Sequence, residues 1–174
     1  MILTQWRTMS QREAATVSSE IVLTDVSFTI APVADDETEP FWRFAGRREF
    51  RLQTCTACRS TRWPPGPVCR ACHSPGGYWQ EVVRGATLES WVVFRRQYFA
   101  EFPVPYTVGL GRLDAGPRFT AYLLSPPGYL PSEGDRLEIA FMDLSAPLLD
   151  IPDPQLPVYT PVLPGKSSEE GERP

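Results

Sequence analysis

Four stretches in the second half of the chain mix polar residues with apolar ones, many of them β-branched or aromatic, over lengths that suit short β-strands. Proline, glycine and aspartate, which favour turns, separate these stretches. They are ATLESWVVFRR at 86–96, YTVGLGRLD at 106–114, RFTAYLLS at 118–125 and DRLEIAFMDL at 135–144. The pattern predicts four or five strands, and the five-stranded OB barrel is the commonest closed sheet for so few residues.

The segment before these strands has the pattern of one short helix. Residues 38–50 read TEPFWRFAGRREF, so that Thr38 can cap the first turn and Pro40 fits within it. Its apolar surface would come from Phe41, Trp42, Phe44 and Phe50. We expect this helix to lead into the segment that contains the cysteines.

The two ends of the chain differ from this middle part. In the first 37 residues, Val26, Phe28 and Ile30 alternate with polar residues and are candidates for a strand that docks on a partner. The final part is rich in proline; its beginning can pack in extended form on the barrel or on a partner, and its last ten residues are expected to be disordered. The predicted organisation is an extension at 1–37, a helix and ribbon at 38–80, an OB-fold barrel at 81–145 and a proline-rich tail at 146–174.

Composition supports a mostly β protein. The 174 residues are 42% hydrophobic and include 19 prolines and 12 glycines. This length allows one modest core with appendages, and the prolines and glycines disfavour long helices.

The net charge of −4 disfavours a nucleic-acid-binding protein, because phosphate binding depends on an excess of lysine and arginine. The stretch from Arg43 to Arg70 is a local exception, with seven arginines and one glutamate. Arginine is the usual base in this chain, since Lys166 is its only lysine. A cluster of thiolates around a metal would also favour positive charge nearby.

The beginning of the chain lacks the apolar run of a secretion signal, and no later segment is apolar for long enough to span a bilayer. We therefore expect a cytoplasmic protein without a membrane partner. In a reducing compartment, paired cysteines are more often metal ligands or redox centres than disulfides.

The four cysteines form two C-x-x-C pairs, Cys55 with Cys58 and Cys69 with Cys72, and ten residues separate the pairs. This spacing lets two turns face each other and present four thiolates tetrahedrally to one zinc ion. Such a site has no open coordination position. The predicted zinc is therefore structural, and its binding would hold the ribbon folded.

Three other interpretations of the cysteines are less favoured. Cys69 to His73 reads CRACH, which is also the attachment signature of c-type haem, but haem attachment would require export and would leave the first pair without a role. His73 could also replace a cysteine as a zinc ligand. A thioredoxin-like redox site would need a βαβ setting, which the pattern lacks.

No catalytic residues are predicted. His73 is the only histidine, so a mechanism with a Ser-His-Asp or Cys-His arrangement is disfavoured. If all four cysteines bind zinc, no thiol is left as a nucleophile.

Several short motifs together resemble one known family, the acyl-CoA-associated zinc-ribbon and OB-fold family, also called domain of unknown function thirty-five. The resemblance covers about residues 38–144 and rests on Phe41-Trp42, FRLQTC at 50–55, Trp63-Pro64-Pro65, Gly85 with Ser90-Trp91, and Pro105-Tyr106. It implies an N-terminal helix, a rubredoxin-like zinc ribbon and an OB barrel. Where many members have glycine after each cysteine pair, this chain has Arg59 and His73, which would be strained if the backbone there is left-handed.

Members of that family are generally non-catalytic subunits of thiolase-like enzymes, so the resemblance implies an accessory subunit that forms a hetero-oligomer with a thiolase, aldolase or acyltransferase. The resemblance also allows an indirect contact of this chain with acyl-CoA. Aromatic residues carry much interface energy, and the candidates for partner contact are Tyr98, Phe99, Phe102 and Tyr106. The alternative function is a nucleic-acid-binding module, because OB barrels with aromatic faces bind single strands.

Overall fold

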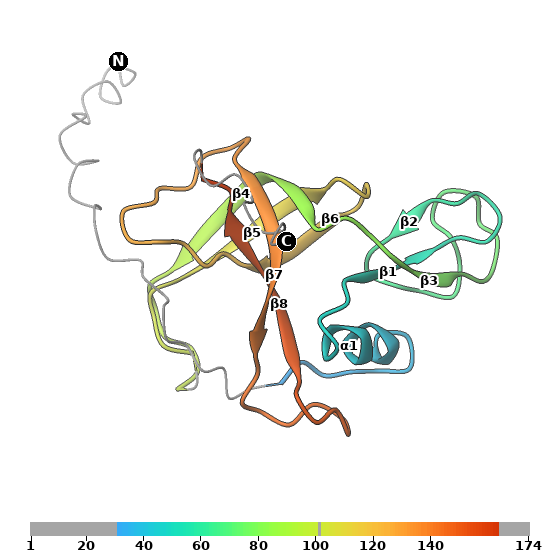
Figure 1. Ribbon diagram of the computed structural model, residues 1–174, viewed down its shortest axis with the longest axis horizontal. Helices are drawn as coiled ribbons and strands as arrows, with labels where there is room; N and C mark the ends of the chain where they lie inside the picture. Colours follow the sequence, from blue (N-terminus) through green and yellow to red (C-terminus); the bar gives the residue numbers. More distant parts are fainter. Residues whose placement is uncertain (1–30, 101, 164–174) are drawn as a thin grey trace, which may run out of the picture.

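A computed structural model describes residues 31–100 and 102–163, and its elements lie in a short helix, a small ribbon and a barrel (Figure 1). The helix is α1 (Glu39–Ala45). The ribbon contains β1 (Arg51–Thr54), β2 (Thr61–Arg62) and β3 (Tyr78–Glu81). The barrel contains β4 (Gly85–Phe94), β5 (Tyr106–Leu113), β6 (Arg118–Tyr122), β7 (Arg136–Asp143) and β8 (Gln155–Pro161). The mostly β prediction is confirmed.

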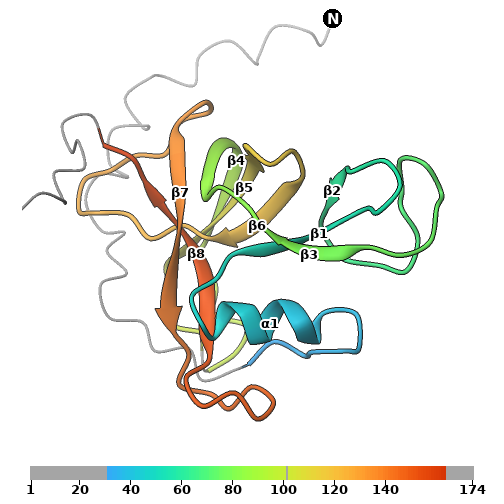
Figure 2. The same ribbon diagram turned by 45° about the vertical axis from the view of Figure 1, so that its right-hand side comes forward.

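The strands form two antiparallel sheets. In the ribbon the order is β2-β1-β3, and in the barrel it is β6-β5-β4-β7-β8. A parallel bridge between Leu123 and Tyr159 brings the two outer strands together, so that the five-stranded sheet nearly closes. The ribbon projects from one side of the barrel, and α1 lies beside both the ribbon and β8 (Figure 2).

The barrel interior follows from the alternation in the sequence. Leu88 of β4, Leu113 of β5 and Ile139 of β7 are buried, whereas their neighbours along the strands are more exposed. A β-bulge between Leu88 and Ser90 shifts the register of β4 against β5. Bulges bend a strand and increase its twist, which helps a short sheet to curl into a barrel.

The fifth strand, β8, comes from the segment that the sequence analysis assigned to the tail. It pairs with β7 along its whole length, from Leu137 opposite Pro161 to Asp143 opposite Gln155. The barrel therefore continues past residue 145. The prolines in this segment made it resemble a loop in the sequence. β8 tolerates them because it has a full partner on one side only, and proline is accepted at sheet edges.

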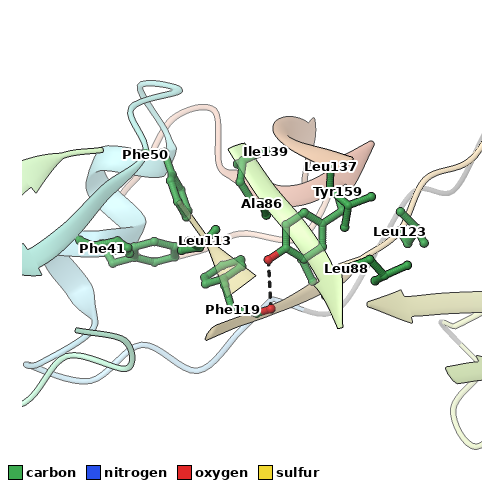
Figure 3. Close-up of a cluster of buried hydrophobic side chains, with 12 residues drawn as sticks. Phe41, Phe50, Ala86, Leu88, Leu113, Phe119, Leu123, Leu137, Ile139 and Tyr159 are labelled. Atoms are coloured by element: carbon green, nitrogen blue, oxygen red, sulfur yellow. Dashed lines mark hydrogen bonds between the residues drawn. The ribbon is translucent and has the colours of Figure 1, made fainter. Parts of the chain in front are cut away.

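One apolar core joins all three parts of the molecule, and Figure 3 shows its residues from the helix and the barrel. Phe41 of α1 and Phe50, which precedes β1, contact Phe119 of β6, with ring centroids 6.2 and 5.3 Å apart. Trp63 of the ribbon lies 4.3 Å from Phe41 and 5.0 Å from Phe119. The ribbon is thus attached to the barrel by packed aromatic rings.

Tyr159 of β8 occupies the centre of this core and is fully buried. Its hydroxyl donates a hydrogen bond of 3.0 Å to the backbone oxygen of Phe119, drawn as a dashed line in Figure 3. A Cβ at Gly111 would lie 2.6 Å from the same hydroxyl oxygen, so the glycine makes room for the tyrosine. Burial raises the pKa of the Tyr159 hydroxyl.

Two predictions concern residues outside the described ranges, namely the possible docking strand at Val26, Phe28 and Ile30 and the disorder of the last ten residues. Across 31–100 and 102–163, no helix combines the length and the apolar character that crossing a bilayer requires. A cytoplasmic location stays a prediction.

Candidate metal centre

The two C-x-x-C pairs lie in two turns with the same backbone hydrogen bonds. In the first turn, the N–H of Arg59 donates to the oxygen of Cys55 at 3.1 Å, and the N–H of Cys55 donates to Ser60 at 2.9 Å. In the second turn, His73 donates to Cys69 at 3.0 Å and Cys69 donates to Ser74 at 2.9 Å. The local sequence thus builds the same ligand-presenting loop twice.

All four sulfur atoms lie within 4.8 Å of one another. The Sγ atoms of Cys55 and Cys72 are 3.7 Å apart, and those of Cys58 and Cys69 are also 3.7 Å apart. A tetrahedral site with Zn–S bonds of about 2.3 Å requires sulfur separations of about 3.8 Å. A disulfide would need about 2.05 Å. The four thiols are therefore positioned to bind a metal ion, as the spacing predicted.

The surroundings of Cys69 favour the thiolate, which is the form that binds a metal. The hydroxyl of Ser60 lies 3.3 Å from its sulfur, and the N–H of Ala71 donates to it at 3.4 Å. These contacts, with the backbone of Cys72, lower the pKa of the Cys69 thiol to about 5. Cys55 and Cys69 are buried, whereas Cys58 and Cys72 are exposed, so the metal would lie near the ribbon surface.

The backbone strain expected after each cysteine pair is present. Arg59 has φ of 63° and His73 has φ of 59°, both in the left-handed region. Residues with a Cβ disfavour this region by about 1–2 kcal/mol. Both turns need it so that the chain can reverse and bring the second cysteine of each pair toward the metal.

The aromatic residues predicted for partner contact lie in the β4–β5 hairpin, far from the cysteines. Tyr98 and Phe99 are 66% and 59% exposed. Phe102 is half-buried and contacts Phe99, and Tyr106 is half-buried and stacks on Phe94 with centroids 4.7 Å apart. Tyr98 and Phe99 are thus available to a partner, whereas Phe102 and Tyr106 pack against each other and against neighbouring rings. Their role in partner contact stays a prediction.

The sequence analysis did not identify two further apolar residues of this hairpin. Trp91 and Val92 are 40% and 49% exposed although they are neighbours in β4 and point to opposite faces. β4 pairs with β7 over Gly85–Thr87, and Leu88 also exchanges backbone hydrogen bonds with Gly134 and Asp135. Within the described ranges, residues 89–94 of β4 have no strand partner on that side. The sequence signal for these residues was WVVF at 91–94, a run of four apolar residues without alternation. Such a run is typical of a strand that is buried on both faces.

We call residues 91–100 and 102–106 the aromatic arm. In Figure 1 the loop of the arm lies to the left of the barrel and the ribbon lies to the right. The arm and the candidate metal centre therefore lie apart, on different sides of the barrel.

Family models match two adjacent parts of the chain. Residues 42–76 match the rubredoxin-like zinc ribbon domain of ChsH2, and residues 79–142 match the C-terminal OB-fold domain of ChsH2. The first match contains all four cysteines. The zinc ribbon and the OB fold predicted from the sequence are confirmed.

Two relatives are informative. A curated protein of Thermomonospora curvata, described as a probable enoyl-CoA hydratase alpha subunit, is 32% identical over 129 residues. The match covers 74% of this chain, and the chain spans 39% of the length of that relative. A solved structure described as an Ltp2-ChsH2(DUF35) aldolase is 26% identical and has a TM-score of 0.64, covering 75% of this chain and 98% of that one.

Proposed function

Because the chain belongs to the ChsH2 zinc-ribbon and OB-fold family, also called DUF35, we propose that it is a non-catalytic subunit that docks on a thiolase-like enzyme acting on acyl-CoA or related thioesters. The observation that carries this proposal is the likeness to a chain of the Ltp2-ChsH2(DUF35) aldolase structure, because the match covers 98% of that chain. The enzyme would be a thiolase, an aldolase or an acyltransferase, and the two chains would form a hetero-oligomer.

The chemistry of the chain supports an accessory role. All four cysteines lie in the candidate metal centre, where structural zinc would use every thiolate. His73, the only histidine, follows Cys72 directly and is exposed in a ribbon turn. Neither a thiol nor an imidazole is left for acyl transfer, so the partner would supply the catalytic groups.

The aromatic arm supports docking. Exposed aromatic residues at Trp91, Tyr98 and Phe99 supply the side chains that dominate interface energies. The free edge of β4 offers backbone donors and acceptors, which a strand of another protein can pair with. A partner that covers this arm would bury apolar surface that is otherwise in water.

The first experiment is a gentle affinity purification of the tagged chain from its native host, with metal analysis of the same sample. We expect a thiolase-like protein in stoichiometric amount and one zinc ion per chain. The purified complex should turn over an acyl-CoA, and the chain alone should not. Recovery of nucleic acid, or of no protein at all, would contradict the proposal.

The arm is tested in the same assay with Tyr98→Ala/Phe99→Ala. We expect recovery of the partner to fall about tenfold or more, because two exposed aromatic contacts are lost. Leu130→Ala is the matched control, since Leu130 is 64% exposed but lies outside the arm. An equal effect of both variants would show that the arm is not the docking surface. Recovery of a hydratase alone would favour the partner class in the name of the Thermomonospora curvata relative.

A further inference from the structure

A basic cleft of about 360 Å³ lies between the second cysteine turn and the β5–β6 hairpin of the barrel. Four arginines line it: Arg62 and Arg70 come from the ribbon, and Arg112 and Arg118 come from the barrel. Trp63 also lines the cleft, and no lining residue is acidic. Part of the basic stretch of the sequence is thus placed against two arginines more than forty residues further along the chain.

The two barrel arginines are held in an arrangement that costs energy. Arg112 and Arg118 are directly opposite each other on β5 and β6, and like charges in this position repel. Glu89 bridges them, accepting a hydrogen bond of 2.7 Å from Nε of Arg112 and one of 2.5 Å from Nε of Arg118. One carboxylate thus serves two guanidinium groups, so the pair keeps an excess of positive charge.

Several arginine donors in the cleft have no partner within the described ranges. The Nη atoms of Arg112 and Arg118 make no hydrogen bond there, and neither does any part of the Arg70 side chain. Arg62 is only 6% exposed, and its Nη1 is buried without a partner, although its Nε and Nη2 bind Gln53 and Gly66 at 2.6 Å. A buried donor on a charged group without a partner is costly, and its presence calls for an acceptor.

The metal centre accounts for only part of this charge. A zinc ion with four thiolates has a net charge of −2, which Arg59 and Arg70 can offset because they lie in the two cysteine turns. Arg112 and Arg118 lie on the opposite wall of the cleft, on barrel strands, and belong to no turn that holds a cysteine. The barrel pair therefore needs an explanation other than the zinc.

We propose that the cleft binds a phosphate group of a small molecule. A phosphate dianion offers several acceptor oxygens and matches the planar fork of arginine, which forms paired, charge-assisted hydrogen bonds with it. Arg112 and Arg118 bind it from the barrel and Arg70 from the ribbon, while Arg62 supplies positive charge from beneath. This site is independent of the proposed partner enzyme, because the cleft and the aromatic arm share no residue.

The test uses the zinc-loaded full chain without a partner, with inorganic phosphate as the probe. Phosphate is titrated at 150 mM NaCl while the ¹H–¹⁵N spectrum of the backbone and of the arginine Nε groups is followed. We expect saturable shifts at Arg70, Arg112 and Arg118. Arg112→Gln/Arg118→Gln should weaken binding about tenfold or more, because charge-assisted hydrogen bonds are lost.

The matched control is Arg95→Gln/Arg96→Gln, which removes the same charge from the exposed β4–β5 loop and should change the affinity less than about twofold. If Arg112→Gln/Arg118→Gln loses its zinc, Arg70→Gln replaces it, since Arg70 makes no hydrogen bond within the described ranges. Shifts that do not saturate, or equal weakening by the cleft and control variants, would overturn the proposal.

A parallel titration with ADP identifies the source of the phosphate. Tighter binding of ADP with a shift of the Trp63 indole resonance assigns the site to a nucleotide-borne phosphate. Equal affinity for ADP and phosphate assigns it to the free ion. Both results support phosphate recognition at the cleft, whereas binding of neither probe rejects it.

Discussion

At the scale of single residues, Arg59 and His73 carry the backbone strain of the two cysteine turns. Each has a left-handed backbone and an exposed side chain, and each donates its N–H to the first cysteine of its pair. The strain persists because the backbone hydrogen bonds of each turn hold the chain in this conformation. Glycine would relieve the strain at both positions, although at Arg59 it would also remove the hydrogen bond from the guanidinium to the Tyr78 hydroxyl.

This strain leads to a prediction for His73→Gly compared with His73→Ala. Both variants remove the imidazole, but only glycine removes the Cβ that disfavours φ of 59°. We expect the glycine variant to be more stable than the alanine variant by about 1 kcal/mol. Because folding and metal binding are coupled in such ribbons, competition with a chelator for zinc measures the difference. Loss of zinc in both variants would instead indicate that His73 is a ligand.

At the scale of elements, the ribbon and the barrel depend on different forces. β1 has four residues and β2 only two, so backbone pairing alone cannot hold the cysteine turns. The barrel strands bury Leu88, Leu113 and Ile139 in a continuous core. The ribbon should therefore need its metal more than the barrel does.

Removal of the metal tests this difference. Structural zinc contributes about 10–16 kcal/mol to the folding of small zinc domains. After treatment with a chelator, we expect fast hydrogen exchange at the amides of Cys55, Arg59, Cys69 and His73, while the amides of β4–β8 stay protected. Exchange followed by mass spectrometry or NMR would distinguish the regions. Loss of protection throughout the barrel would contradict the prediction.

Truncation tests whether β8 is part of the barrel. A chain that ends at residue 154 lacks β8 and its buried Val158 and Tyr159, whereas a chain that ends at residue 163 retains them. Two large buried side chains contribute about 3–6 kcal/mol, which is much of the stability of an ordinary domain. We expect the shorter chain to lose its cooperative thermal transition by circular dichroism and the longer one to keep it.

At the scale of the whole molecule, the aromatic rings around Phe119 fix the ribbon to the barrel. This ring contacts Phe41 of the helix, Trp63 of the ribbon and Tyr159 of β8. The joint also positions the two walls of the basic cleft, because Trp63 both contacts Phe119 and lines the cleft.

Phe119→Ala should therefore affect the whole molecule. Removal of a buried phenyl ring costs about 3–5 kcal/mol, and here the cavity would open between all three parts. We expect a lower midpoint in urea unfolding. We also expect faster hydrogen exchange than in the unmodified protein in both the ribbon and the barrel. Leu130→Ala, which alters an exposed side chain, should leave the midpoint unchanged. A change confined to the barrel would show that the ring does not join the parts.

The parts that the sequence predicted well are those whose information is local. The helix near Thr38, the strands that begin at Gly85 and Tyr106, and the cysteine turns all follow from spacing and periodicity within a few residues. Residues 155–161 were predicted to pack in extended form on the barrel or on a partner, but not as a paired strand, because Pro157 and Pro161 resemble loop residues and only the sheet shows that they lie at an edge.

The sequence by itself determined the metal centre, because two identical short turns set the position of each ligand and only their mutual approach depends on the fold. Tertiary structure alone decided that Arg112 and Arg118 face Arg62 and Arg70, since these pairs lie more than forty residues apart. It also decided that Trp91 and Val92 are exposed in the described part of the chain, because burial depends on which segments pack on the two faces of β4. Spacing is a local property of the chain, whereas clefts and exposed surfaces arise from contacts between distant segments.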